Sequence, residues 1–190
     1  MKKVVLAVLA VMCVASFSFA GNFGLGIKAG AGENDWKVTM WDNIDKNYGF
    51  AGAELLYEFG QTGSNRFGLK VGFDVYQQDK ASDVWGEEKV NTFNVPVTIY
   101  YKWDRGVGAV SYFLGAGFTY VRSIVETGGS PKEYSKSKGL AHGTIGAEYR
   151  FSELFALGVD ATYNFGAKLD EGYVSDHSGF RGALVGRFYF

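Results

Sequence analysis

The chain has 190 residues, a formal net charge of −1 and 17% aromatic residues, with only one cysteine and two prolines. This length is typical of one domain. The near-neutral charge argues against a nucleic-acid partner, because such proteins carry a basic surface. A single cysteine excludes a small extracellular module that is held together by disulfides.

The N-terminus has the pattern of a secretory signal peptide. Residues 1–20 read MKKVVLAVLAVMCVASFSFA, in which two lysines precede an apolar run. Ser18 and Ala20 place small residues at the two positions that signal peptidase requires. We therefore expect cleavage between Ala20 and Gly21, and a mature domain over residues 21–190. Loss of the two lysines shifts the net charge from −1 to −3.

After residue 20, the chain shows the alternation of apolar and other residues that is typical of β-strands. The clearest segments are 23–29, 66–76, 92–103 and 155–165, and weaker ones are 48–59, 110–124, 139–151 and 179–190. No further run of about 18 apolar residues is present, so we expect no transmembrane helix in the mature chain. The predicted fold class is all-β, with eight strands.

The predicted connections alternate between long and short along the chain. They span 31–47, 60–65, 77–91, 104–109, 125–138, 152–154 and 166–178. Transmembrane barrels combine longer extracellular loops with short periplasmic turns. A soluble meander has no reason to keep this order over seven connections. The pattern therefore predicts an antiparallel up-and-down transmembrane β-barrel.

Side-chain size indicates which face of each strand points outward. One face is crowded with Phe, Tyr, Trp, Leu and Val, and the other mixes charged residues with glycine. An eight-stranded barrel has room inside only for its own side chains, and the aromatic faces would overfill it. This argues against a soluble lipocalin-like barrel and predicts lipid-facing apolar faces. Tyr57, Trp103 and Tyr163 are among the aromatic residues near strand ends that predict two interfacial girdles.

The opposite faces predict a polar lumen that is filled by pairs of charged side chains. Both signs of charge occur there in similar numbers, as a buried network requires, because an unpaired buried charge is costly. The predicted network consists of Lys28, Glu54, Glu58, Arg66, Lys70, Asp74, Lys102, Glu148, Arg150, Asp160, Arg181 and Arg187. We expect Arg66 and Lys70 to lie beside Glu54 and Glu58.

In the last residues of the chain, every second side chain is a phenylalanine, and aromatic side chains are also frequent on the predicted lipid-facing side of the other strands. Phe188 and Phe190 alternate with Tyr189 at the end of the sequence GRFYF. A final strand that pairs with the first closes the barrel, so that no strand edge is left in lipid. We expect replacement of Tyr189 by Phe to matter little.

Residues 21–190 resemble the small eight-stranded outer-membrane β-barrel family, the porin-like group that includes OmpX and the OmpA membrane domain. The resemblance rests on NVPVTIYYKW, on SYFLGAGFTYV after a short turn, and on the terminal FYF. It implies that Phe188 and Phe190 belong to the signal that the outer-membrane assembly machinery recognises. Periplasmic chaperones are further expected partners. The family is functionally diverse, so the resemblance implies no particular activity.

Motifs for catalysis or cofactor binding are weak. Asp176, His177 and Ser178 form the one triad-like cluster, but adjacent residues rarely converge as a catalytic triad. His142 has lumen parity and is expected to join the polar interior, because no second His lies at metal-ligand spacing. The run 42–45 lacks the closing Glu of a calcium loop. We therefore expect no catalytic residue, no metal and no cofactor.

Two further features bear on transport and on surface contacts. Pro96 lies inside a predicted strand, where it removes a ladder donor and predicts a bulge or local opening. Each of the first two outer loops has four acids against two lysines, a net charge of −2. Divalent cations that bridge lipopolysaccharide could bind there, although a solvated loop surface is the simpler interpretation.

Together these features predict a monomeric or weakly associating, non-enzymatic protein of the outer membrane of a Gram-negative-type bacterium. It would contact lipid and lipopolysaccharide and serve envelope integrity or surface interaction. The alternative function is a narrow porin or lateral-diffusion transporter of small solutes. A third possibility is an enzyme that modifies lipid A or acyl chains.

Overall fold

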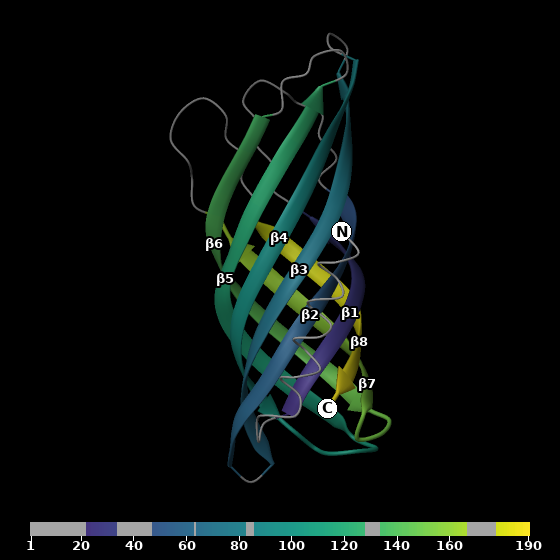
Figure 1. The fold of residues 1–190 in the computed structure, drawn as a ribbon, viewed down its shortest axis with the longest axis vertical. Coiled ribbons are helices and arrows are strands. Elements are labelled where there is room, and N and C mark those ends of the chain that lie inside the picture. Colours follow the sequence, from purple (N-terminus) through teal and green to yellow (C-terminus); the bar gives the residue numbers. More distant parts are fainter. Residues whose placement is uncertain (1–21, 34–46, 63, 83–85, 128–133, 167–177) are drawn as a thin grey trace, which may run out of the picture.

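The computed structural model describes residues 22–33, 47–62, 64–82, 86–127, 134–166 and 178–190. Eight antiparallel strands form one closed barrel (Figure 1). The strands are β1 (Asn22–Glu33), β2 (Asn47–Thr62), β3 (Asn65–Ser82), β4 (Gly86–Trp103), β5 (Val110–Thr127), β6 (Tyr134–Arg150), β7 (Phe155–Phe165) and β8 (Gly179–Tyr189). The predicted all-β, eight-stranded up-and-down barrel is confirmed. Among the described residues, no helix is long and apolar enough to span a membrane.

The barrel closes between its last and first strands. β8 pairs with β1 from Gly24↔Tyr189 to Gly32↔Arg181, and it pairs with β7 on its other side. The N–H of Phe190 donates to the carbonyl of Phe23 at 2.8 Å. The chain therefore remains hydrogen-bonded through its final residue.

The outer connections differ from the predicted lengths. The predicted loop 77–91 is mostly a continuation of the β3–β4 hairpin, which pairs from Gln77↔Asn91 to Ser82↔Gly86 and leaves only 83–85 between the strands. β5 and β6 likewise extend into the predicted loop 125–138. Strand alternation marks a strand only where one face is apolar, and the described outward residues of these extensions, Gln77, Asn91 and Ser137, are polar. The sequence pattern therefore underestimated the length of the strands.

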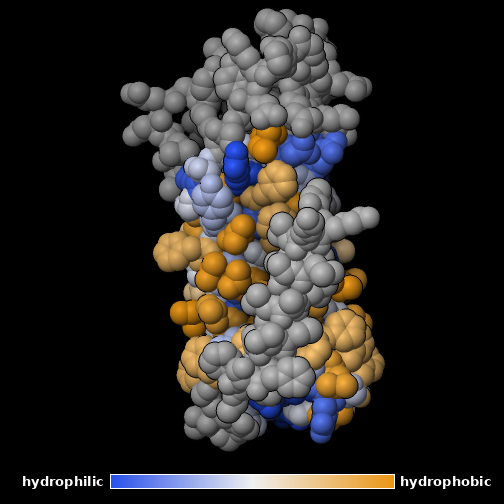
Figure 2. Space-filling model, in the orientation of Figure 1, coloured by the Kyte–Doolittle hydropathy of each residue, from blue (hydrophilic) through white to orange (hydrophobic). Residues whose placement is uncertain are grey.

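The outward surface of the barrel is an apolar belt with a defined outer limit. Large apolar side chains such as Phe118, Ile99 and Leu184 are more than 60% exposed. Figure 2 shows hydrophobic surface around the middle and lower wall, with hydrophilic surface above and below. Outward positions become polar at Gln77, Asn91, Arg122 and Ser137 on β3 to β6. The belt is the surface that lipid covers, and β3 to β6 continue beyond it (Figure 1).

Pro96 interrupts the β3–β4 ladder without forming a bulge. The pairs Val71↔Val97 and Asp74↔Asn94 keep the same register on both sides of the interruption, and no pair joins the strands between them. The irregular register lies elsewhere, between Phe59 and Gln61 of β2. Of the two predicted alternatives, the structure therefore has the local opening.

Candidate functional site

The inward faces of the strands carry the candidate site, an ionic network that crosses the lumen. All twelve predicted lumen residues take part in at least one ion pair, at distances of 2.6 to 4.0 Å. A thirteenth residue, Asp104, joins them from the turn after β4. The most exposed of these side chains, that of Arg66, is only 17% exposed.

Inward glycines provide the space for these long side chains. A Cβ atom on Gly26 would lie 2.6 Å from Cγ of Glu54, and one on Gly158 would lie 2.9 Å from Nη1 of Arg187. Tyr100 lies over Gly68 in the same way. Each of these long chains lies over the backbone of a neighbouring strand, and only glycine permits that approach. This packing accounts for the mixture of charge and glycine in the sequence.

Arg187 on β8 is the centre of the network and is 1% exposed. Its Nε donates to Glu54 Oε1 at 2.8 Å and its Nη1 to Glu148 Oε2 at 3.2 Å. Its Nη2 donates to both carboxylate oxygens of Asp160 at 2.7 Å. The three acids come from β2, β6 and β7. A planar guanidinium with five donors suits this arrangement, and it joins strands from across the barrel.

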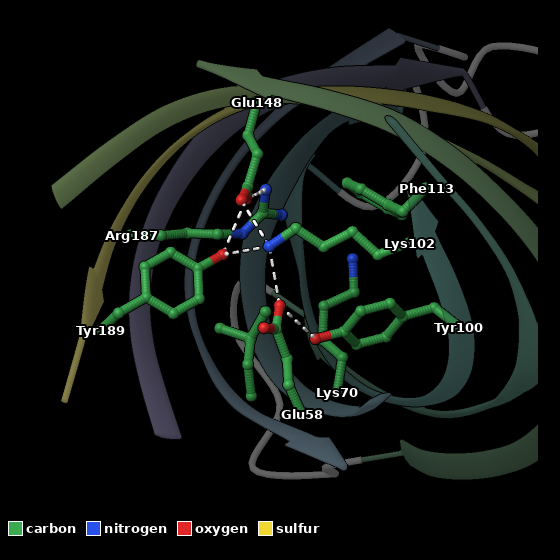
Figure 3. A pocket seen from close by; sticks show the side chains of 9 residues that line it. Glu58, Lys70, Tyr100, Lys102, Phe113, Glu148, Arg187 and Tyr189 are labelled. Carbon is green, nitrogen blue, oxygen red and sulfur yellow. Dashed lines mark hydrogen bonds and ion pairs between the residues drawn. The ribbon is translucent and has the colours of Figure 1, made fainter. Parts of the chain in front are cut away.

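Lys102, one residue before the end of β4, forms a second centre near a short turn. Figure 3 shows Glu58, Glu148 and Tyr189 around its ammonium group. Its Nζ lies 2.7 Å from Glu58 Oε1 and 2.6 Å from Glu148 Oε1. The Tyr189 hydroxyl donates to Glu148 Oε2 at 2.8 Å and accepts a hydrogen bond from Lys102 at 3.3 Å. The cavity among these side chains measures about 10 Å³. That volume holds about one water molecule.

The network continues toward the outer end through Asp74. This carboxylate lies 2.7 Å from Lys28 Nζ and 3.2 Å from Arg181 Nη1. Lys70 pairs with Asp160 at 2.8 Å and lies 3.9 Å from a Glu54 oxygen. Lys70 therefore does lie beside Glu54, as expected, but its closer partner is an acid on the opposite side of the barrel.

Asp104 completes the inner end of the lumen. Its Oδ2 lies 2.8 Å from Arg66 Nε and 3.7 Å from Arg150 Nη1. Its Oδ1 accepts hydrogen bonds from the Gly106 N–H at 3.0 Å and the Ser111 hydroxyl at 3.1 Å. Gly106 has a φ of 80°, which favours glycine, and its amide can therefore turn toward the carboxylate. Arg66 also donates to Glu58 at 3.1 Å, which is the expected pairing.

The environment of Asp104 stabilises its ionised form. Burial by itself would raise the pKa of this carboxyl, but the hydrogen bond from Gly106 and the charges of Lys102, Arg150 and Arg66 outweigh burial. The pKa of Asp104 therefore lies below its ordinary value. The turn residue is a permanent anion at neutral pH.

Toward the outer end, several inward side chains are polar and uncharged. Thr92 and Ser123 share a hydrogen bond of 3.1 Å between β4 and β5. His142 lies between two hydroxyls, with Nε2 2.8 Å from Thr98 Oγ1 and Nδ1 2.9 Å from Thr119 Oγ1. His142 thus takes part in the polar interior, where the sequence placed it.

The structure describes the predicted assembly residues but not the predicted cleavage site. Phe188 and Phe190 point outward and are 44% and 63% exposed. Their role in assembly remains a prediction. Ala20 and Gly21, the predicted cleavage positions, lie outside the described residues.

The weaker motifs lie mostly outside the described residues as well. Asp176, His177 and the run 42–45 fall there, and so does most of the acidic sequence of the first outer loop. Ser178 is described and is 9% exposed. Within the described ranges, no group of three His, Cys, Asp or Glu residues is placed to hold a metal ion.

Sequence reasoning missed three members of the network. Asp104 continues the inward alternation of Lys102, so extending the predicted strand by one residue would have found it. Tyr100 lies on the same face within the predicted segment 92–103, but it was not counted because it is uncharged; its hydroxyl donates to Glu58 at 3.3 Å. Tyr189 was expected to matter little, yet it is 4% exposed and bonded to Glu148. Its inward position between Phe188 and Phe190 places the hydroxyl in the lumen, and the small effect of Tyr189→Phe on assembly stays a prediction.

A closed barrel with an apolar outer belt and a charged interior defines the class of integral outer-membrane β-barrels. The chain belongs to the outer membrane protein beta-barrel domain family, whose model matches residues 4–188. Membership places the protein in the outer membrane of Gram-negative-type bacteria. No curated protein matches the chain.

Solved structures share the fold at low sequence identity. The outer membrane protein OprG from Pseudomonas aeruginosa is 12% identical with a TM-score of 0.62, over 90% of this chain and 96% of that one. Ail, the attachment invasion locus protein of Yersinia pestis, in complex with the heparin analogue sucrose octasulfate, is 17% identical with a TM-score of 0.57, over 90% and 99%. The N-terminal barrel domain of P. aeruginosa OprF is 16% identical with a TM-score of 0.54, over 90% and 99%.

Proposed function

We propose that the protein is a non-catalytic outer-membrane barrel with a lumen closed to solutes, and that it serves envelope integrity or surface interaction. The observation that carries this proposal is the network around Arg187 and Lys102. The two cations bind four acids from three strands, with space for about one water beside Lys102. An eight-stranded lumen filled in this way has no continuous path for water or solutes.

The part of the barrel beyond the lipid belt supports a surface role. β3 to β6 extend past the belt and bear polar outward residues, including Gln77 and Ser137. The acidic first outer loop would attract divalent cations that bridge lipopolysaccharide. Ail, the attachment invasion locus protein of Yersinia pestis, has the same fold. This likeness supports an interactive role in general and does not identify a ligand.

We further propose that the chain is exported and assembled as the sequence predicts. The signal peptide would be removed, periplasmic chaperones and the assembly machinery would receive residues 21–190, and the product would be a monomer. Intact mass of the purified membrane form should correspond to a chain that begins at Gly21. Phe190→Asp should lower the outer-membrane level, whereas the outward exposed Leu184→Val should not.

Single-channel recording in planar bilayers tests the closed lumen directly. The refolded protein should show only rare, small conductance events at neutral pH. Replacing both Arg66 and Lys70 with Ala should raise conductance, because it leaves Glu58 and Asp160 with fewer partners. Large, steady currents from the unmodified protein would overturn the closed lumen and favour a porin.

The second candidate function, lateral diffusion of small solutes, has one observation in its favour, the ladder opening beside Pro96. The Pro96 ring covers the opening from the inside, since a Cβ on Gly72 would lie 2.9 Å from Pro96 Cγ. Lateral transport predicts faster uptake of a small apolar alcohol into vesicles that hold the wild type than into empty vesicles. Equal uptake would remove this candidate.

A further inference from the structure

A buried histidine lies where the ionic and the uncharged parts of the lumen meet. His142 on β6 is 2% exposed and contacts Thr98 of β4 and Thr119 of β5. Gly117 on β5 pairs with both Thr98 and His142. Because Gly117 has no side chain, the imidazole can reach across β5 to β4. The ring therefore joins three neighbouring strands from inside the lumen.

The two hydroxyl partners depend on the protonation state of the ring. A neutral imidazole has one donor nitrogen and one acceptor nitrogen, so one threonine hydroxyl must donate to His142. A protonated imidazole has two donors, and both hydroxyls must then accept. Thr119 has another acceptor at hand, because its Oγ1 lies 3.4 Å from Asn164 Oδ1. Protonation therefore requires this hydrogen-bonded chain to reorganise.

The charged groups of the same part of the lumen are already unbalanced. The inward positions facing this region on β4 and β5 hold the uncharged Asn94, Thr98 and Thr119. The charged groups that the other described strands bring there are Lys28 of β1, Glu54 of β2, Lys70 and Asp74 of β3, Asp160 of β7, and Arg181 and Arg187 of β8. β6 itself adds Lys138, which alternates inward like His142, and Glu148, which pairs with Arg187. Together these are five cations against four carboxylates. Lys70 is the nearest in register, since it pairs directly with Thr98.

A charged imidazole would thus enter a buried region that already has an excess positive charge. Burial and like charges both oppose the ionised form of a side chain. The free-energy cost of the charged imidazole therefore destabilises the folded, closed state. The cost decreases when this part of the lumen loosens and admits water.

We propose that His142 is an acid-sensitive switch of the lumen. In its neutral form it ties β4 to β6 and supports the closed network. In its protonated form it repels the cations of β1, β3 and β8, forces both threonine hydroxyls to act as acceptors and lets the lumen loosen and conduct. This inference rests on the closed lumen proposed above.

Single-channel recording at pH 7, 6, 5 and 4.5 tests the switch in the full mature chain. The chain has two histidines, so His177→Gln is the matched control for His142→Gln. Wild type and His177→Gln should be nearly silent at pH 7 and should show at least ten-fold more open time at pH 4.5. His142→Gln should stay silent throughout, because a glutamine amide cannot gain a proton in this range.

The outcomes separate the two proposals. Large currents at pH 7 would overturn the closed lumen itself. Silence of the wild type at every pH, or an equal acid response in His142→Gln, would overturn the switch and leave the closed lumen standing.

A second measurement covers the case in which His142→Gln does not fold. In wild-type protein in nanodiscs, the His142 ring resonances should shift over the pH range in which conductance rises. Conductance that rises while these resonances stay constant would overturn the switch, because the responding group would then lie elsewhere.

Discussion

The inner and outer parts of the lumen are built from different interactions. Toward the inner end, Arg187 and Lys102 hold carboxylates at 2.6 to 3.2 Å in a connected network. Toward the outer end, Thr92 and Ser123 make a neutral hydrogen bond, and His142 lies between two hydroxyls. Both regions are buried, so burial alone does not distinguish them.

The difference lies in what the removal of one partner leaves behind. A carboxylate that loses its cation remains a buried charge, and breaking such a pair costs roughly 3–5 kcal/mol. A hydroxyl that loses its neutral partner forfeits a hydrogen bond of about 0.5–1.5 kcal/mol. The comparison therefore predicts a steep gradient in mutational sensitivity along the barrel axis.

The largest effect is expected at Arg187. Arg187→Met keeps the volume of the side chain but leaves Glu54, Glu148 and Asp160 without their shared cation. We expect a loss of about 3–5 kcal/mol in the free energy of unfolding. Urea unfolding in lipid vesicles measures this loss. Arg105→Met, at an exposed site in the inner turn, is the matched control and should change stability by less than about 0.5 kcal/mol.

Substitution of Lys102 should cause the next largest loss of stability, and a second substitution should restore part of it. Lys102→Met leaves Glu58 and Glu148 facing each other without the ammonium, and we expect a loss of about 3 kcal/mol. Adding Glu148→Gln to this variant removes one of the two charges and should restore part of that loss. The control is Glu148→Gln in the otherwise unchanged chain. If Glu148→Gln costs as much stability in the Lys102→Met variant as it does alone, the two residues are not coupled.

Asp104 should have an intermediate effect with a distinctive pH dependence. Asp104→Asn weakens charged hydrogen bonds and should cost about 1.5–3 kcal/mol at pH 7. The pKa of Asp104 is lowered in the folded state, so its contribution is complete above the ordinary carboxyl value of about 3.9 and is lost as pH falls through the folded value. The difference between wild type and variant should be constant from pH 7 to 5 and shrink in stronger acid. A difference that shrinks already between pH 7 and 6 would contradict this assignment.

The smallest effect is expected for the pair Thr92 and Ser123. Thr92→Val alone leaves the buried Ser123 hydroxyl without this partner and should cost about 1 kcal/mol. The double variant Thr92→Val, Ser123→Ala removes both groups and should be no less stable than the single one. Losses comparable to that of Arg187→Met would erase the contrast between the two regions.

Strand number, facing and lumen charges could all be predicted from the sequence. Alternation such as Phe67, Leu69 and Val71 against Arg66, Gly68 and Lys70 assigns each residue to one face, because successive strand side chains point to opposite sides. Side-chain size then decides which face is inward, since Phe and Tyr at every second position would overfill eight strands. These two facts place the twelve predicted ionic residues in the lumen before any partner is known; Asp104, beyond the predicted strand end, was missed.

Partner choice depended on the closed barrel. Lys70 was expected beside Glu54, but its closest acid is Asp160, which is 90 residues away in sequence. Alternation also could not mark the outer parts of β3 and β4, where Gln77, Gln78 and Asn91 provide no apolar face, and it left Tyr189 unassigned. Which face of a strand a residue occupies is a local property, and the sequence determines it. Which cation meets which acid depends on strand register around the whole barrel, and only closure of β8 on β1 sets it.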